Sequence, residues 1–172
     1  MKNPVATYRL QLSPDFTFAD LEEILDYLEE FGISTIYSAP FFQARKGSSH
    51  GYDITDPLNI NKQIGRLDRF KKISRKLQQK GMDWLQDIVP NHMAFDKKNT
   101  WLQDVFELGP NSVHFRFFDI DWNDEDPKLM APFLGDPLPG VLQKGEFQLK
   151  FSKKGFVFRY YDQEYFAAAR SY

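Results

Sequence analysis

Two short polar segments contain the residue types that bind ligands and transfer protons, and each follows a stretch expected to form a β-strand. The first is His50-Gly51-Tyr52-Asp53 and the second is Asp87-Ile88-Val89-Pro90-Asn91-His92. In parallel barrels the carboxyl ends of the strands build the active site, so both segments are expected on the functional face. Taken alone, each is also typical of turns and loop capping. Their pairing at equivalent strand ends favours a shared site.

The elements that must position these segments alternate between strand and helix patterns. We predict, in order, a strand over 5–12, a helix capped by Thr17 and ended by Gly32, a strand over 34–40 buried on both faces, a polar loop over 43–53, a helix that closes at Gly81, and a strand over 83–89 stopped by Pro90. Thr17 and Asp20 have the spacing of a capping box. Strand–helix alternation of this kind predicts a parallel α/β architecture.

The pattern changes after Pro90. A short helix over 101–108 is closed by Gly109-Pro110, and residues 119–140 are rich in Asp, Pro and Gly, which predicts a loop. Alternation over 147–151 and 156–160 around Lys153-Lys154-Gly155 predicts a β-hairpin. We therefore divide the chain into residues 1–92, the first strand–helix units, and residues 93–172, the start of an inserted subdomain.

Composition excludes several classes of protein. The net charge of −2 gives no general attraction to nucleic acid or to an anionic membrane. The N-terminus lacks the apolar region of a signal peptide, and no apolar run approaches the roughly 20 residues of a membrane span. We predict a cytoplasmic protein with neither a nucleic-acid nor a membrane partner. Eight basic residues lie between Lys62 and Lys80 against one acidic residue, which we interpret as the solvated side of an amphipathic helix.

No metal or cofactor is expected. There is no cysteine, which excludes a disulfide framework and a thiolate zinc site. The acidic run over 119–126 lacks the glycine and the terminal glutamate spacing of an EF-hand.

Several ordered motifs resemble a known enzyme family. Asp87 to His92 resembles the first conserved region of the α-amylase superfamily. More particular segments resemble the maltooligosyl trehalose synthases, and they lie at 5–12, 49–57, 84–93, 118–122, 132–135 and 156–161. The resemblance covers nearly the whole chain. It implies the N-terminal part of a (β/α)₈ barrel, strands one to three, with a subdomain inserted after strand three. Some α-amylases bind calcium through the strand-three asparagine, so the resemblance leaves Asn91 open as a ligand.

The resemblance also implies a reaction and roles for the site residues. The reaction converts the terminal α-1,4 linkage of a maltodextrin to α,α-1,1 by intramolecular transglycosylation. Tyr52 would stack on the sugar ring at the cleaved bond, and His92 would hydrogen-bond its hydroxyls. Supporting roles fall to Asp87 and Asn91, which would hold the strand-three loop, and to His50 and Asp53, which would line the same pocket.

The catalytic carboxylates are expected outside this chain. Retaining glycosyl transfer needs a nucleophile and an acid/base about 5 Å apart, and in the family these come from strands four and five. None of the 24 acidic residues matches those positions. We therefore expect a segment that is inactive alone and that self-associates through exposed barrel edges. The alternatives are a non-catalytic carbohydrate-binding or interaction fragment, or another hydrolase of the superfamily.

Overall fold

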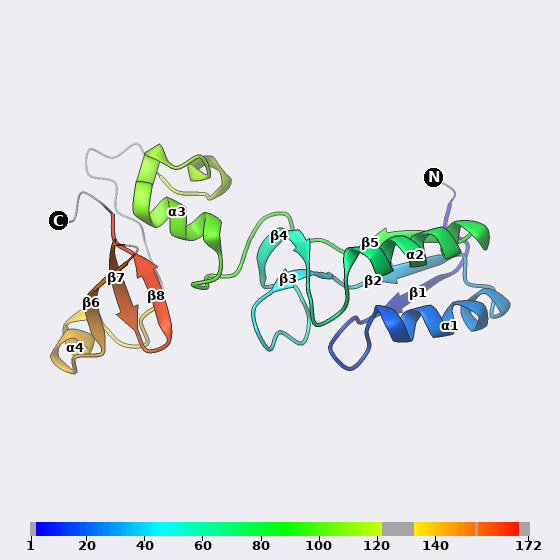
Figure 1. Cartoon of the computed structure of the whole chain (residues 1–172), viewed down its shortest axis with the longest axis horizontal. Helices are drawn as coiled ribbons and strands as arrows, with labels where there is room; N and C mark the ends of the chain where they lie inside the picture. The colour runs from blue at the N-terminus through cyan, green and yellow to red at the C-terminus, as the bar shows by residue number, and fades with distance from the viewer. Residues whose placement is uncertain (1–2, 122–132, 154, 169–172) are drawn as a thin grey trace. The chain divides into compact units, whose positions relative to one another are not determined.

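The computed structural model describes residues 3–121, 133–153 and 155–168. The chain divides into two units, Met1–Ala94 and Phe95–Tyr172. Figure 1 shows the elements of each unit, and the two units are described separately below. No helix in the described ranges is long and apolar enough to cross a membrane.

Three short parallel strands form the main sheet of the first unit, in the order β1-β2-β5. Their bounds are β1, Thr7–Leu10; β2, Thr35–Ser38; and β5, Asp83–Gln86. All three are shorter than the predicted strands. Pro40, which follows β2, has no N–H to donate and so cannot continue the pairing of the central strand.

Helices α1 (Phe18–Glu30) and α2 (Leu67–Gln79) confirm the two predicted helices. The Thr17 hydroxyl accepts a hydrogen bond from the Ala19 N–H at 3.1 Å, and the Asp20 carboxylate accepts one from the Thr17 N–H at 2.7 Å. This pair satisfies N–H groups that the first helical turn leaves without partners. Gly32 follows the first helix with φ of +86°, a conformation that glycine adopts without strain.

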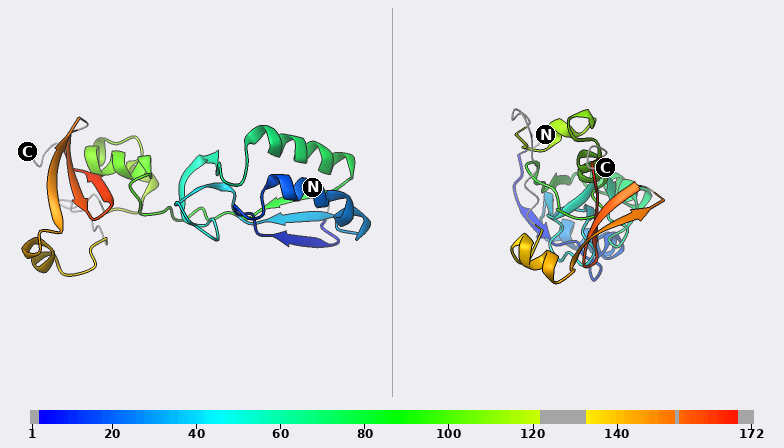
Figure 2. Two further views of the ribbon diagram at one scale, coloured as in Figure 1. Left: turned by 60° about the horizontal axis from the view of Figure 1, so that its bottom comes forward. Right: turned by 90° about the vertical axis from the view of Figure 1, so that its left-hand side faces the viewer.

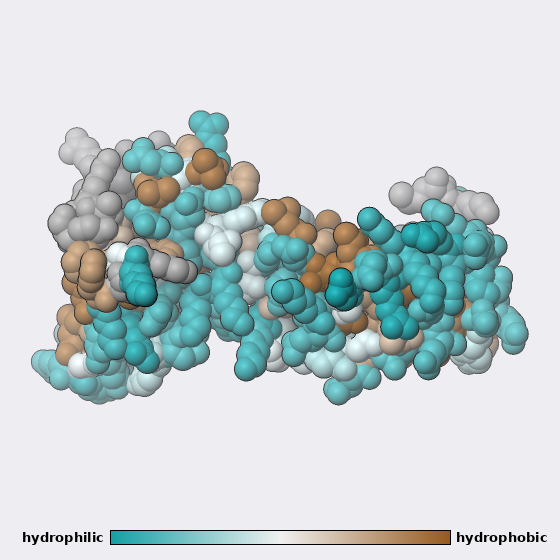
Figure 3. All heavy atoms as spheres, viewed as in Figure 1, coloured by the Kyte–Doolittle hydropathy of each residue, from teal (hydrophilic) through white to brown (hydrophobic). Residues whose placement is uncertain are grey.

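The core of the first unit lies between these helices and one face of the sheet. Phe18, Leu21 and Ile73 are fully buried in it, together with Ile36 of the central strand. Figure 2 shows both helices on the same side of the strands. The outward side of α2 is hydrophilic (Figure 3). It carries exposed basic residues such as Lys71 and Arg75, in agreement with an amphipathic helix covering a sheet.

The prediction of a polar loop over 43–53 is partly wrong. Strand β3 (Phe42–Ala44) pairs antiparallel with β4 (Ile54–Ile60), and the register shifts twice along the pair. The sequence pattern misses this ribbon because it is short and bulged, and because β4 contains Pro57 and Asn59, which are rare in strands. The loop that remains, residues 45–53, includes the first polar segment.

The second unit contains α3 (Thr100–Leu108), α4 (Leu138–Gln143) and a three-stranded antiparallel sheet in the order β6-β7-β8. The strands are Phe147–Ser152, Gly155–Tyr160 and Gln163–Phe166. The predicted helix and hairpin are confirmed. The predicted loop over 119–140 is interrupted where α4 begins, with Pro137 as its N-cap and Pro139 in its first turn. Residues 122–132 of that predicted loop lie outside the described residues.

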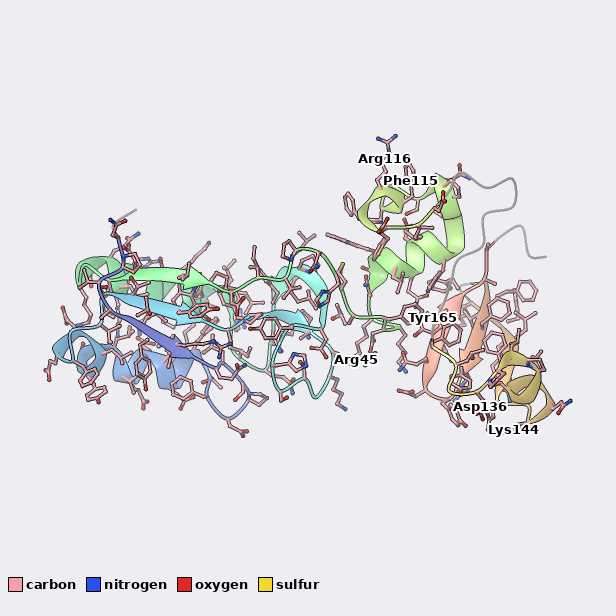
Figure 4. The ribbon with its side chains drawn as sticks, turned by 180° about the vertical axis from the view of Figure 1, so that it is seen from behind. Arg45, Phe115, Arg116, Asp136, Lys144 and Tyr165 are labelled. Carbon is pink, nitrogen blue, oxygen red and sulfur yellow. The ribbon has the colours of Figure 1, made fainter. Side chains whose placement is uncertain are left out.

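Strand β8 was not predicted, and it joins β7 through a two-residue turn, since Tyr160 and Gln163 are paired in register. Tyr161, the first turn residue, has φ of +52°, a position at which glycine is the usual choice in this kind of turn. Tyr165 of β8 is buried against Phe95, Phe106 and Phe133. Figure 4 shows Tyr165 within this unit, on the strand that packs beside α3.

Candidate functional site

A carboxylate, two phenols and a guanidinium meet at the carboxyl ends of the parallel strands. The Tyr52 hydroxyl donates to Oδ2 of Asp87 at 2.5 Å, and the Tyr37 hydroxyl reaches the same oxygen at 3.2 Å. A terminal nitrogen of Arg9 donates to the Tyr52 oxygen at 3.2 Å and lies 3.8 Å from Asp87 Oδ2. The Asp87 side chain is 17% exposed and that of Arg9 is 44% exposed. The carboxylate is therefore held from several sides, while Arg9 stays accessible.

Strand register explains why these side chains meet. Arg9 of β1 and Tyr37 of β2 are paired in register, so both point to the sheet face opposite the helices. The Arg9 guanidinium carbon lies 5.5 Å from the centre of the Tyr37 ring. Asp87 directly follows β5, and its N–H donates to the Ser38 carbonyl at the end of β2. Tyr52 comes from the loop between β3 and β4.

That loop is held in shape by short-range hydrogen bonds around Gly51. Its N–H donates to the Ser48 hydroxyl at 3.1 Å, and Ser48 in turn donates to Asp53. Gly51 has φ of +78°, and a Cβ there would lie 2.6 Å from the Pro40 carbonyl oxygen. Only glycine fits this close approach. The loop thus carries Tyr52 to the strand ends.

His50 lies beside Tyr52 on the same loop. Its Nδ1 accepts a hydrogen bond from the Tyr52 N–H at 3.0 Å, and the two rings stack with centres 5.7 Å apart and an interplanar angle of 25°. Asp53 is 4.0 Å from His50 Nδ1. The structure therefore brings together four of the predicted site residues, namely His50, Tyr52, Asp53 and Asp87.

Asn91 and His92 are placed differently. Both are exposed, and the His92 Nδ1 lies 3.2 Å from the Asn91 side-chain oxygen. Within the described residues neither forms a hydrogen bond with Tyr52 or Asp87. These two predicted residues follow the same strand end as Asp87 but present their polar groups to solvent.

Hydrogen bonds within the site raise the pKa values of both Tyr52 and Arg9. Donation to Asp87 raises the pKa of Tyr52, burial adds to the rise, and Arg9 opposes it. The hydrogen bond with Tyr52 raises the pKa of Arg9. At neutral pH Tyr52 is therefore a neutral donor and Arg9 a cation. Oδ2 of Asp87 accepts hydrogen bonds from two hydroxyls, those of Tyr37 and Tyr52.

Sequence reasoning missed Arg9 and Tyr37 as site residues. Arg9 lies between Tyr8 and Leu10 in an alternating stretch, and the polar member of such a stretch points away from the core. That alternation was the available signal for Arg9. Tyr37 carried no such signal, because the predicted second strand was interpreted as buried on both faces. No group of three metal-ligating side chains occurs in the described part of the chain.

The second unit has a hollow of its own between α3 and the sheet. It has a volume of about 360 Å³ and is lined by Lys97, Thr100, Gln103, Asp104, Glu107, Val157, Glu164 and Phe166. Two of its polar side chains already have partners within the unit. Gln103 forms hydrogen bonds with the backbone of β8. Asp104 accepts a hydrogen bond from Ser112 and lies 3.1 Å from His114 Nδ1. The bond from Ser112 lowers the pKa of Asp104, and His114 acts in the same direction. We interpret this hollow as structural.

Comparison with known proteins gives a consistent set of relatives. The family model described as the α-amylase catalytic domain matches residues 17–154. A putative maltooligosyl trehalose synthase of Mycobacterium tuberculosis (strain ATCC 25618 / H37Rv) is 40% identical over 138 residues, which cover 76% of this chain and 18% of that protein. A maltogenic α-amylase of Bacillus acidopullulyticus is 36% identical over 121 residues, which cover 69% of this chain and 20% of that protein.

Solved structures give similar matches. A crystal structure of maltooligosyl trehalose synthase is 34% identical with a TM-score of 0.86, over 95% of this chain and 22% of that one. The maltooligosyltrehalose synthase from Arthrobacter ramosus is 33% identical with a TM-score of 0.83, over 96% of this chain and 21% of that one. The chain thus spans about a fifth of the length of the relatives it matches.

Proposed function

The chain belongs to the α-amylase family of enzymes, and from this membership we propose that it forms part of the substrate site of a maltooligosyl trehalose synthase. The substrate is a maltooligosaccharide, and the reaction moves its terminal glucosyl linkage from α-1,4 to α,α-1,1 within one molecule. The observation that carries the proposal is the hydrogen bond between Tyr52 and Asp87, which joins two family motifs at one point.

Each residue of the site has a role in this proposal. Tyr52 has its hydroxyl held by Asp87 and Arg9, and His50 stacks beside it, so its ring is fixed as a platform for the apolar face of a sugar. His92 and Asn91 supply exposed donors and acceptors for sugar hydroxyls. Asp53 supports the loop, and Asp87 positions Tyr52. Arg9 adds an accessible cation beside the platform.

We propose that residues 1–92 form the first three strands of a (β/α)₈ barrel and residues 93–172 begin a subdomain inserted after the third. The parallel order β1-β2-β5, with helices on one face, supports the barrel. In a closed barrel β1 and β5 would each have another neighbour, whereas in the described sheet both are edge strands. The isolated chain is therefore expected to self-associate through these edges, which sedimentation velocity would detect.

We also propose that the 172-residue chain is inactive alone, because none of its carboxylates corresponds to the nucleophile or to the acid/base. In the retaining mechanism the nucleophile displaces the leaving sugar at the anomeric carbon while the acid gives that sugar's oxygen a proton. The same group then removes a proton from the attacking hydroxyl. Asp87 takes no part in either step.

Two incubations with maltopentaose test the proposal, with the products separated by chromatography. The chain alone should give no turnover above its Asp87→Ala variant. A chimera in which this chain replaces the matching segment of the Mycobacterium tuberculosis relative should form a product ending in an α,α-1,1 linkage. A chimera that elutes as a folded protein but forms no such product contradicts the proposed function. Release of maltose or glucose instead would indicate a hydrolase of the same family.

A further inference from the structure

Four side chains at the carboxyl ends of the parallel strands form a closed ring of contacts. The hydroxyls of Tyr37 and Tyr52 both donate to Oδ2 of Asp87. Arg9 completes the ring, because it donates to the Tyr52 oxygen at 3.2 Å and its guanidinium carbon lies 5.5 Å from the centre of the Tyr37 ring. The proposed function uses Arg9 only as an accessible cation, although its contacts join it to the other three members.

The bond from Arg9 gives the Tyr52 hydroxyl a fixed direction. A guanidinium has no acceptor, so Arg9 can only donate to the phenol oxygen, and the single proton of the phenol is left for Asp87. The oxygen is therefore held from two sides, by β1 and by the residue that follows β5. These two bonds fix the far end of the phenol, and the stacked His50 ring fixes its plane.

Arg9 is itself held in the position from which it donates. Its register partner Tyr37 places an aromatic face beside the guanidinium, an arrangement that attracts the positive charge. A planar guanidinium can lie against a ring and still donate from its edge, whereas a lysine ammonium has no such flat fork. The site thus uses a property that is particular to arginine.

A second contact between the first strand segment and the loop does not depend on Arg9. Gln11, two residues further along the chain, has its Nε2 atom 3.4 Å from the carbonyl oxygens of Ser49 and His50. The first strand segment therefore holds the loop by its backbone through Gln11 and by the Tyr52 hydroxyl through Arg9. With Gln11 in place, a substitution of Arg9 should release the ring without releasing the loop.

A simpler role for Arg9 is that of a counter-ion for Asp87. Its nearest recorded approach to Oδ2 of that carboxylate is 3.8 Å, longer than the 3.2 Å to the Tyr52 oxygen. The shorter contact favours a role exerted through Tyr52. The two roles differ in one respect that an experiment can reach: a counter-ion keeps its effect when the Tyr52 hydroxyl is removed, and a residue that acts through this hydroxyl loses it.

We propose that Arg9 is a positioning residue, which acts on the reaction by holding the Tyr52 hydroxyl and so keeping the phenol ring in the orientation that receives the sugar. The use of Tyr52 as a platform rests on the proposed function. The coupling of Arg9 to Tyr52 rests on the structure alone.

A double-mutant cycle in the chimera, with maltopentaose as substrate, tests the proposal. Arg9→Met removes the donors of a long side chain. It should lower kcat about tenfold and leave KM within about twofold, because a displaced platform costs most where the geometry of the reacting ring is critical. Adding Arg9→Met to Tyr52→Phe should cause no further loss, since phenylalanine has no oxygen for Arg9 to hold.

Two further variants make the outcome specific. Arg9→Lys can still donate to the phenol and should recover part of kcat. Arg75→Met makes the same change at an exposed position of α2 and should keep wild-type kinetics. Additive losses from Arg9→Met and Tyr52→Phe overturn the proposal, because they show an effect of Arg9 that does not pass through the hydroxyl. Wild-type kinetics of Arg9→Met also overturn it.

NMR of the 172-residue chain with labelled tyrosine ζ-carbons gives a measurement that needs no activity, and Tyr52→Phe assigns the signal. Arg9 opposes the rise in the pKa of Tyr52. The titration of Tyr52 should therefore move to higher pH in Arg9→Met and stay in place in Arg75→Met. An unchanged titration in Arg9→Met overturns the proposal. A shifted titration, found together with a wild-type chimera that forms no α,α-1,1 product, refutes the proposed function and leaves the coupling of Arg9 to Tyr52 standing.

Discussion

The phenol oxygen of Tyr52 and the Oδ2 atom of Asp87 lie 2.5 Å apart across 35 residues of sequence. Tyr52 belongs to a loop between two short antiparallel strands, whereas Asp87 follows the last parallel strand. Their bond connects the irregular part of the first unit to its sheet. A change that moves either group therefore also affects the other. Substitutions of Tyr52 can be used to separate its contact with substrate from its structural support of the site.

Tyr52→Ala should reduce kcat/KM of the chimera much more than Tyr52→Phe does. The phenylalanine keeps the stacking face and loses only the hydrogen bonds to Asp87 and from Arg9, which should lower the stability by about 1 kcal/mol. The alanine loses the platform as well. Steady-state kinetics with maltopentaose, accompanied by thermal melting, distinguishes the two effects. Equal kcat/KM values for both variants would show that the ring does not contact the sugar.

His92→Ala should lower kcat/KM of the chimera by about 30- to 1000-fold. This corresponds to the roughly 2–4 kcal/mol that a hydrogen bond contributes when it strengthens in the transition state. Its melting temperature should stay unchanged, because His92 is exposed and bonds only the neighbouring Asn91 in the described structure. A variant with near-normal kcat/KM rules out a substrate contact by His92. A large drop in melting temperature would instead indicate a bracing role.

Gly51→Ala should destabilise the chain more than Gly47→Ala, although both glycines have φ near +80°. The left-handed conformation costs an alanine about 1–2 kcal/mol at either position. At Gly51 the new Cβ would also meet the Pro40 carbonyl oxygen, whereas at Gly47 nothing lies within 4 Å. We expect an additional loss of about 1–3 kcal/mol at Gly51. Urea unfolding of the two variants measures the difference, and equal losses would disprove the steric argument.

Glu22 should make the stability of the first unit depend on acid. Lys72 and Lys76 of α2 each lie 2.7 Å from its carboxylate, and they lower its pKa from 4.5 to about 2. Since the folded pKa is the lower one, the stabilisation is complete above pH 4.5 and is lost as the pH falls towards 2. The exposed lysines are screened, so we expect about 1–3 kcal/mol.

Urea unfolding at several pH values between 2 and 6 measures this effect. Glu22→Gln should flatten the pH dependence in that window, whereas Glu23→Gln, an exposed position on the same helix, should leave it intact. A wild-type profile that Glu22→Gln does not change would place the acid sensitivity elsewhere.

Gln103→Leu should destabilise the second unit by about 2–4 kcal/mol. The buried amide of Gln103 donates to the Glu164 carbonyl at 2.9 Å and accepts from the Phe166 N–H at 3.0 Å, so leucine leaves two backbone groups of β8 unpaired. Gln143→Leu, at an exposed position of α4, should change the stability little. Similar losses for the two variants would mean that the amide does not anchor β8.

The sequence predicts the helices of this chain better than its shortest strands. Thr17, Gly32 and Gly81 act locally, through caps and turns, so both helices of the first unit were expected and are confirmed. Strand β8 depends instead on the burial of Tyr165 and on pairing with β7, which no local pattern reveals. The short α4 was hidden for the opposite reason, because its prolines were taken as signs of a loop.

Some residues of the candidate site could likewise be predicted from the sequence, and others could not. Tyr52 and Asp87 were identified because their segments follow expected strands. Arg9 was not, since its position depends on register with Tyr37 and on a loop that arrives 43 residues later. Such contacts are set by tertiary structure. The same limit applies to Asn91 and His92, whose orientation towards solvent no spacing indicates.

The order β1-β2-β5 has a consequence for folding during synthesis on the ribosome. Thr35 and its register partner Asp83 emerge several seconds apart at synthesis rates of about 5–20 residues per second. During that interval α1 can form, but the central strand offers one unpaired row of backbone groups to any other nascent chain. Slow translation before residue 86 would lengthen this exposure, so chaperone capture should be greatest while β5 is still being made.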